Sequence, residues 1–167
     1  MLYRRNRAKT GGDLWYLEKV SDNEWTGHPF LENVSDENWG RFSPDGRYVA
    51  YVSRESGQDK VYVCDFPHAE RKTPVSKNGG NSPHWNADGS ELFYVEGNVI
   101  VSVPVSTTAE FAAGQATALF PLSGSGFWDV FPDGKRFLIV EPVGERPEPS
   151  IHVVLNWHQE FRGRERR

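Results

Sequence analysis

Short apolar runs rich in β-branched and aromatic residues recur along this chain, separated by polar stretches that contain Gly or Pro. Three of these runs cover residues 48–52, 92–95 and 137–140, and a further apolar segment follows each of them. No segment keeps apolar residues at positions i, i+3, i+4 and i+7 for more than one helical turn. Because 16 Gly and 11 Pro also interrupt the sequence, the pattern predicts an all-β protein.

The sequence repeats itself with a nearly constant period. An Asp-Gly pair precedes each of the three apolar runs: Asp45-Gly46, Asp88-Gly89 and Asp133-Gly134. The steps between the pairs are 43 and 45 residues, which is the length of one four-stranded blade of a β-propeller. The repeat therefore predicts a propeller-type fold.

Each Asp-Gly pair has the chemistry of a tight hairpin turn. The Asp carboxylate can accept a hydrogen bond from the backbone N–H two residues further on, and Gly adopts a positive φ without a steric cost. Pro44 and Pro132 precede two of the pairs and preset φ in the turn. We therefore assign these residues a structural role in turns, ahead of a catalytic role for the carboxylates.

The remaining apolar segments supply further strands of each blade. Third strands are expected at 61–63, 99–101 and 151–155, outer strands near 27–31, 72–76 and 116–120, and two earlier strands at 2–4 and 14–17. The count is about fourteen strands in three to four blades. We expect one domain over residues 1–161, with blade fragments 1–34, 38–77, 82–121 and 127–157, and a basic tail at 162–167.

One stretch of the repeat carries a family resemblance. Residues 42–53 read Phe-Ser-Pro-Asp-Gly-Arg-Tyr-Val-Ala-Tyr-Val-Ser, and the third strand at 61–63 reads Val-Tyr-Val. This motif resembles the repeat of TolB-type β-propellers, a WD-repeat-like architecture, over nearly the whole chain. The order of segments 13–17, 42–53, 84–94 and 151–157 is similar to the C-terminal propeller region attached to bacterial serine/threonine protein kinases. The resemblance implies six or more blades, and it allows a periplasmic location while the sequence leaves the compartment open.

An arc of fewer than four blades would expose two apolar blade faces that a closed propeller covers. Three arrangements would cover them: the arc continues in a longer polypeptide, copies of the chain join into a ring, or four blades close by themselves. For a chain that starts at Met1 we expect self-association first, and hence a homo-oligomer.

Composition and charge exclude several other classes. Hydrophobic residues make up 37% and charged residues 25% of the 167 residues, as in a folded domain. Eight of the 19 cationic residues lie in 4–9 and 162–167, which leaves 11 cationic against 22 acidic residues in 10–161. A body this acidic repels phosphate backbones, so we expect no nucleic-acid partner.

No apolar run approaches 18 residues, and the basic start leads into polar sequence, so we expect neither a membrane span nor an export signal. The single cysteine, Cys64, excludes an internal disulfide and a thiolate metal cage. Neither feature points to a particular compartment.

Four polar residues are expected to meet at one mouth of the propeller channel: Arg41, Asn81, His84 and Asp129. They lie at or next to the first strand of their blades, the strand that lines the channel. Polar groups that converge at a channel mouth are a candidate site for a ligand or partner, and ordinary solvated loop chemistry is the alternative.

The six tryptophans divide by their surroundings. Trp15, Trp85 and Trp128 lie in or beside strands, and we expect them in the core between blades. Trp25 and Trp39 lie in polar stretches, so we expect them to be partly exposed and candidate anchors for a partner.

The function favoured by these observations is a non-catalytic propeller scaffold that binds a protein or peptide. The five histidines show no paired metal-ligand spacing and no nucleophile motif occurs, so we expect no enzyme activity, no metal and no cofactor. Two alternatives stay open: a metal-dependent propeller hydrolase or lyase, and the gating propeller of a prolyl-oligopeptidase-type serine peptidase. The peptidase would require an α/β-hydrolase domain, which is not in this sequence.

Overall fold

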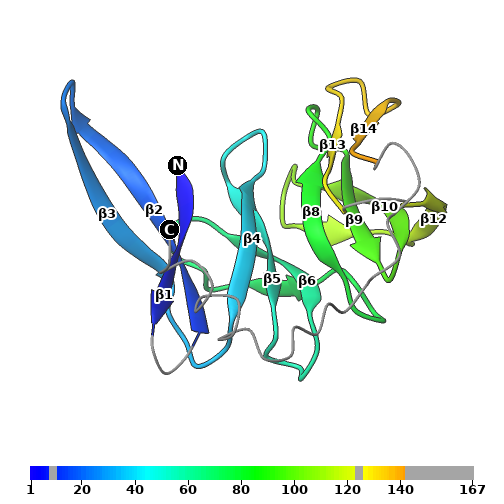
Figure 1. The fold of residues 1–167 in the computed structure, drawn as a ribbon. Helices are drawn as coiled ribbons and strands as arrows, with labels where there is room; N and C mark the ends of the chain where they lie inside the picture. Colours follow the sequence, from blue (N-terminus) through cyan, green and yellow to red (C-terminus); the bar gives the residue numbers. More distant parts are fainter. Residues whose placement is uncertain (8–10, 123–125, 142–167) are drawn as a thin grey trace, which may run out of the picture.

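The computed structural model describes residues 1–7, 11–122 and 126–141, and every regular element in that part of the chain is a β-strand (Figure 1). The strands are β1 (Leu2–Arg7), β2 (Gly11–Ser21), β3 (Glu24–Leu31), β4 (Glu37–Phe42), β5 (Tyr48–Ser53), β6 (Lys60–Asp65), β7 (Lys72–Pro74), β8 (Asn81–Trp85), β9 (Glu91–Glu96), β10 (Val99–Ser106), β11 (Ala112–Ala113), β12 (Thr117–Pro121), β13 (Trp128–Val130) and β14 (Phe137–Ile139). The predicted all-β fold is confirmed.

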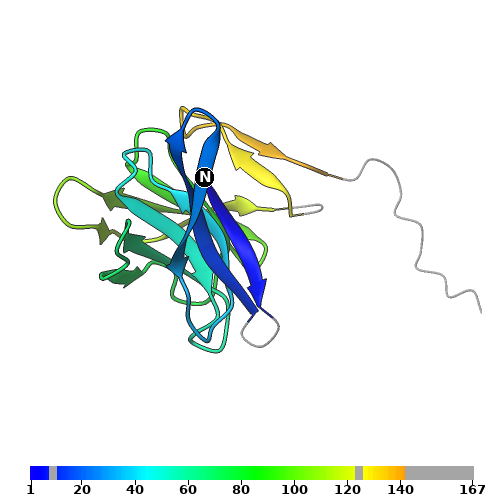
Figure 2. The ribbon, with the colours of Figure 1, turned by 90° about the vertical axis from the view of Figure 1, so that its left-hand side faces the viewer.

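The strands form successive antiparallel sheets, each made of neighbours in sequence. The orders are β1-β2-β3, then β4-β5-β6-β7, then β8-β9-β10 with β11 and β12 both on β10, then the hairpin β13-β14. The first strands β4 and β8 lie next to one another, and β8 also contacts β13. Figure 2, which looks from the side of the first sheet, shows the sheets arranged one behind another. This arrangement is a partial β-propeller.

The core consists of three layers of side chains, one between each pair of neighbouring sheets. Leu14 and Phe30 of the first sheet pack with Tyr51 of β5. On the other face of β5, Ala50 and Val52 pack into a layer shared with the third sheet. Since successive side chains of a strand point to opposite faces, a strand covered on both faces requires a continuous apolar run. Burial of each large side chain contributes roughly 1.5–3 kcal/mol.

The last copy of the repeat is described only in part. Its first two strands form the hairpin β13–β14, whereas the expected third strand at 151–155 and the basic tail at 162–167 lie outside the described residues. The third sheet contains β11, a short strand on β10 that the sequence pattern did not predict. No helix long and apolar enough to cross a membrane occurs among the described residues.

All three Asp-Gly pairs lie in turns. Gly46, Gly89 and Gly134 have φ values of +72°, +73° and +66°. Asp45, Asp88 and Asp133 each accept a hydrogen bond from the backbone N–H two residues later, at 3.1, 2.9 and 2.9 Å. Burial alone would raise the pKa of Asp45, but hydrogen bonds from Ser43 and Arg47 outweigh it and lower the pKa to about 2.

Gly134 is also a point of close approach between two successive turns. A Cβ atom at this position would lie 2.7 Å from the Nδ2 atom of Asn86 in the turn that follows β8. A side chain there would therefore be strained by its φ and would also push the two turns apart.

A carboxyl group is fully buried at the start of β4. Glu37 is 0% exposed, and its Oε1 accepts a hydrogen bond from the Ser53 hydroxyl at 3.1 Å. Within the described part of the chain, its Oε2 has no hydrogen-bond partner. Burial, reinforced by the nearby carboxylates of Asp13 and Asp36, raises the pKa of Glu37 to about 7.

This pKa predicts a pH-dependent stability. The folded state binds the Glu37 proton more tightly than the unfolded chain, so its contribution is fully present below the ordinary pKa of 4.5 and is lost as the pH rises through about 7. In urea unfolding between about pH 5 and about pH 8, the wild type should lose up to about 3 kcal/mol relative to Glu37→Gln. The exposed Glu24→Gln should follow the wild type. If the free energy of unfolding changed equally with pH in the wild type and in Glu37→Gln, the raised pKa of Glu37 would be contradicted.

Candidate functional site

Three polar side chains from successive sheets meet where the first strands end. Arg41 lies in β4, His84 in β8 and Asp129 in β13, each four residues before the Asp of its Asp-Gly turn. Because the repeat places them at the same level of neighbouring sheets, all three line one cavity of about 260 Å³. Phe42, Pro44, Trp85, Asn86 and Ala87 form the rest of its lining. We call this the channel-mouth cavity.

His84 is the most enclosed titratable group of the channel-mouth cavity. Its side chain is 11% exposed, and its ring lies 4.3 Å from the ring of Trp128, measured between centroids. The Nδ1 atom lies 3.1 Å from the carbonyl oxygen of Ser82. Since a carbonyl only accepts hydrogen bonds, the neutral ring carries its proton on Nδ1, and Nε2 lies 3.7 Å from Asp129 Oδ1.

The surroundings of His84 favour its neutral form. Burial lowers the pKa of His84, and the positive charge of Arg41 lowers it further. The hydrogen bond to Ser82 and the negative charge of Asp129 oppose this shift without cancelling it. The ring is therefore uncharged at neutral pH and gains a charge only on acidification.

The wall of the cavity is apolar and rigid, and its rim is charged. Trp85 is buried, and its indole Nε1–H donates a hydrogen bond to the carbonyl oxygen of Arg41 at 3.1 Å, which fastens β8 to β4. Arg41 is exposed, and the Asp129 side chain is 69% exposed. The cavity thus offers a cation, an anion and a neutral imidazole around aromatic surface, a combination suited to binding.

The fourth residue expected at this mouth lies elsewhere. Asn81 is exposed at the start of β8 and does not line the cavity. The pairing of β8 with β9 shifts register between Asn81 and His84, and Ser82 between them has φ +50°. Asn81 pairs with Val95 and His84 with Phe93, two residues away on β9, so Asn81 lies at the opposite end of β8 from the cavity.

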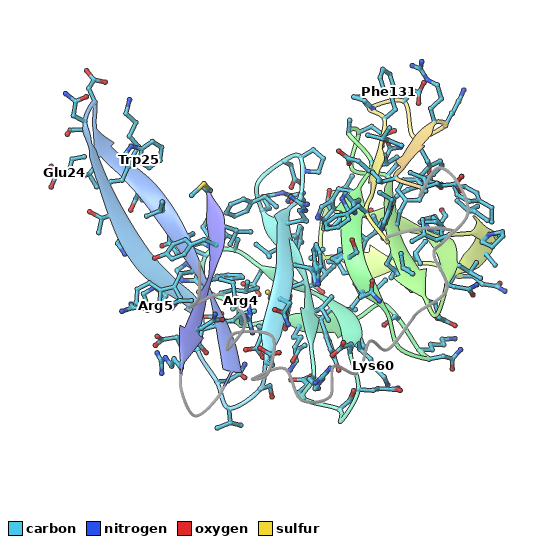
Figure 3. All side chains as sticks on the ribbon, viewed as in Figure 1. Arg4, Arg5, Glu24, Trp25, Lys60 and Phe131 are labelled. Carbon is cyan, nitrogen blue, oxygen red and sulfur yellow. The ribbon has the colours of Figure 1, made fainter. Side chains whose placement is uncertain are left out.

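Most of the tryptophans have the burial that their surroundings in the sequence predicted. Trp25 is 55% exposed near the tip of the β2–β3 hairpin (Figure 3), and Trp39 in β4 is 50% exposed. Trp85 and Trp128 are buried. Trp15 is half-buried, with the Arg5 guanidinium 4.6 Å from its ring centroid. Neither exposed tryptophan lines the channel-mouth cavity, so they form separate candidate contacts.

The sequence pattern missed Trp85, Asn86 and Trp128 as parts of the site or its support. The signal that could have found the site is the position four residues before each Asp-Gly pair. Within residues 1–7, 11–122 and 126–141, no three His, Cys, Asp or Glu side chains are grouped so that they could hold a metal ion.

The stacked antiparallel sheets define a TolB-like β-propeller fold. The structure of TolB from Acinetobacter baumannii matches with a TM-score of 0.61 and 15% identity, over 86% of this chain and 35% of that chain. A putative TolB from Agrobacterium tumefaciens matches with a TM-score of 0.52 and 15% identity, over 72% of this chain and 45% of that chain. At these identities the similarity concerns the fold.

A similarity in sequence points the same way. The Tol-Pal system protein TolB of Alcanivorax borkumensis is 38% identical over 63 residues, which is 36% of this chain and 14% of that protein. No protein-family model matches the sequence. The chain therefore spans less than half of the TolB structures and about one seventh of this TolB sequence.

The depressed pKa of His84 predicts a loss of stability in acid. The unfolded chain binds a proton at His84 more readily than the folded chain, so the contribution of His84 to the free energy of unfolding falls as the pH drops through the ordinary histidine pKa of 6.5. Glu37 contributes with the opposite sign in both wild type and His84→Gln, so the two proteins are compared with each other. His84→Gln should remove this loss, measured by urea unfolding between about pH 7.5 and about pH 5. His68→Gln, at an exposed position, should behave as the wild type. An equal acid loss in His84→Gln would contradict the burial argument.

Proposed function

We propose that this chain is a non-catalytic propeller scaffold that binds a protein or peptide at the channel-mouth cavity. The observation that carries the proposal is the convergence of Arg41, His84 and Asp129 from three successive sheets on one cavity. A volume of about 260 Å³ suits a side chain or a short peptide segment rather than a large ligand. Rigid scaffolds that present loops and strand ends favour recognition of this kind.

The chemistry of the cavity indicates the type of segment. Arg41 can bind a carboxylate in two-point geometry, and Asp129 can bind a cationic group beside it. Phe42 and Trp85 supply apolar surface between the charges. A peptide with an apolar residue next to acidic and basic residues would complement all of these groups.

The TolB-like fold supports the scaffold reading. We further propose a sensor or interaction role like that of the propellers attached to bacterial protein kinases. The order of the segments in the sequence, which is similar to theirs, supports this role. The hydrolase or lyase alternative would need a metal ion, and among the described residues no three His, Cys, Asp or Glu side chains are grouped to hold one.

A peptide selected from a random display library against the wild type tests this proposal. The double variant Arg41→Ala/His84→Ala should weaken binding of that peptide at least about tenfold in calorimetry, because its charged and enclosed contacts are removed. The matched control is Arg54→Ala/His68→Ala, which removes an exposed Arg and an exposed His elsewhere. Equal affinity of wild type and Arg41→Ala/His84→Ala would refute the site. Loss of binding in Trp25→Ala/Trp39→Ala alone would place the contact on the exposed tryptophans.

We also propose that copies of this chain associate through the last hairpin. Leu138 of β14 is 67% exposed, and Phe131, which follows β13 (Figure 3), is 49% exposed. Both border an apolar cavity of about 370 Å³. A further sheet would cover this face in a propeller. The first sheet of a second copy has the architecture of such a sheet. We therefore propose that it covers the outer face of the last hairpin.

Light scattering of the 167-residue chain tests this association. The wild type should have the mass of a dimer or larger ring, and Leu138→Glu should shift it to the monomer because a charge enters the apolar face. Leu119→Glu, 42% exposed on β12, is the control and should leave the mass unchanged. A monomeric wild type would end the proposal.

A further inference from the structure

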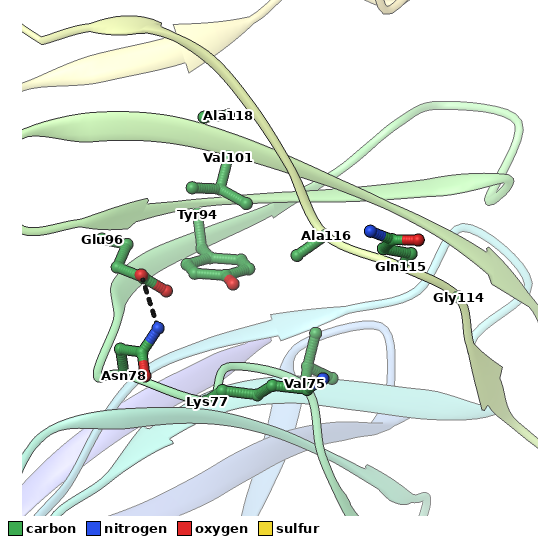
Figure 4. A pocket seen from close by; sticks show the side chains of 10 residues that line it. All are labelled: Val75, Lys77, Asn78, Tyr94, Glu96, Val101, Gly114, Gln115, Ala116 and Ala118. Atoms are coloured by element: carbon green, nitrogen blue, oxygen red, sulfur yellow. Dashed lines mark hydrogen bonds between the residues drawn. The ribbon is translucent and has the colours of Figure 1, made fainter.

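A second cavity opens between the second and third sheets (Figure 4). Its volume is about 340 Å³, and none of its lining residues belongs to the channel-mouth cavity. The segment after β7, the strands β9 and β10, and the segment that enters β12 enclose it. Its size is at the lower end of the range for small-molecule sites. We call it the inter-sheet cavity.

Small residues make up most of one wall of the cavity, with Gln115 beside them. Gly114, Ala116 and Ala118 line that wall. Ala118 of this wall lies where the pairing of β12 with β10 shifts register: Ile100 pairs with Phe120, and Val101 pairs with Ala118. Protein interiors are normally packed without such gaps, so this part of the sheet contact is left open.

The cavity holds two opposite charges that are not paired with each other. Lys77, in the segment between β7 and β8, extends along one wall (Figure 4) and has no ion-pair partner among the described residues. Glu96, at the end of β9, accepts a hydrogen bond from Asn78 Nδ2 at 3.2 Å and also interacts with the Tyr94 hydroxyl. A carboxylate can accept several hydrogen bonds, so Glu96 keeps capacity for a cationic donor.

The floor between these charges is apolar. Tyr94, Val101 and Val75 are all buried and line it. Burial, together with the negative charge of Glu96, raises the pKa of Tyr94 to about 12, so the phenol stays neutral at neutral pH. The Tyr94 ring, 1% exposed, forms the buried base of this floor.

We propose that the inter-sheet cavity binds a small zwitterion with an apolar body, of the size of an amino acid or a dipeptide. Lys77 binds the carboxylate of the ligand, Glu96 binds its ammonium group, and the apolar body lies over Tyr94 and Val101 beside the alanine wall. The site is independent of the channel-mouth cavity, because the two share no lining residue.

Titration calorimetry of the 167-residue chain tests the proposal with phenylalanine and phenylalanyl-alanine as zwitterions. N-acetylphenylalanine lacks the ammonium group, and phenylalaninamide lacks the carboxylate. At least one zwitterion should bind with a Kd of about 1 mM or lower, and each blocked compound should bind about tenfold more weakly. Lys77→Gln should weaken the zwitterion and leave phenylalaninamide unaffected. Glu96→Gln should weaken the zwitterion and leave N-acetylphenylalanine unaffected.

Matched variants locate the site. Ala118→Leu fills the cavity and should abolish binding, and Ala116→Val should do the same if Ala118→Leu does not fold. Thr117→Leu, between them but outside the lining, and Lys135→Gln, an exposed lysine on the last hairpin, should bind as the wild type. Arg41→Ala/His84→Ala should also bind as the wild type, which separates this proposal from the proposed function. No binding of either zwitterion at about 10 mM, unchanged binding to Ala118→Leu, or equal binding of blocked and free compounds would each overturn it.

Discussion

Burial of both faces of the central strands is the constraint on which the rest of this structure depends. β5 and β9 each lie between two neighbouring layers of side chains, so every residue of Tyr48–Ser53 is buried. Such a strand cannot shift by one residue without moving each side chain into the opposite layer. The pairing of β4 with β5 and of β8 with β9 is thereby fixed. The positions of Arg41 along β4 and of His84 along β8 follow from it.

Local features of the chain were sufficient to predict the architecture. The Asp-Gly pairs are followed by apolar runs at a period of 43 to 45 residues, and each pair forms its own turn through hydrogen bonds within two residues. Neither feature depends on distant contacts. The same local reasoning distinguished the buried Trp85 and Trp128 from the exposed Trp25 and Trp39.

Features that depend on contacts between sheets were not predictable. Asn81 was expected beside His84, but it lies at the start of β8, whereas the cavity lies at the end of this strand. The burial of Glu37 depends on the first sheet covering β4, and a charged residue in a polar stretch gives no sign of it. The inter-sheet cavity likewise lies beside three small residues, one of them at an irregular pairing, and it forms only where two sheets meet.

The contact of Gly134 with Asn86 has a consequence for the width of the propeller opening. Neighbouring turns can approach so closely only because one of them lacks a β-carbon. How closely the last hairpin can approach the sheet before it therefore depends on the β-carbon that Gly134 lacks. Any larger residue here would have to displace the Asn86 side chain or move the last hairpin outward, with every strand of the sheets left as it is.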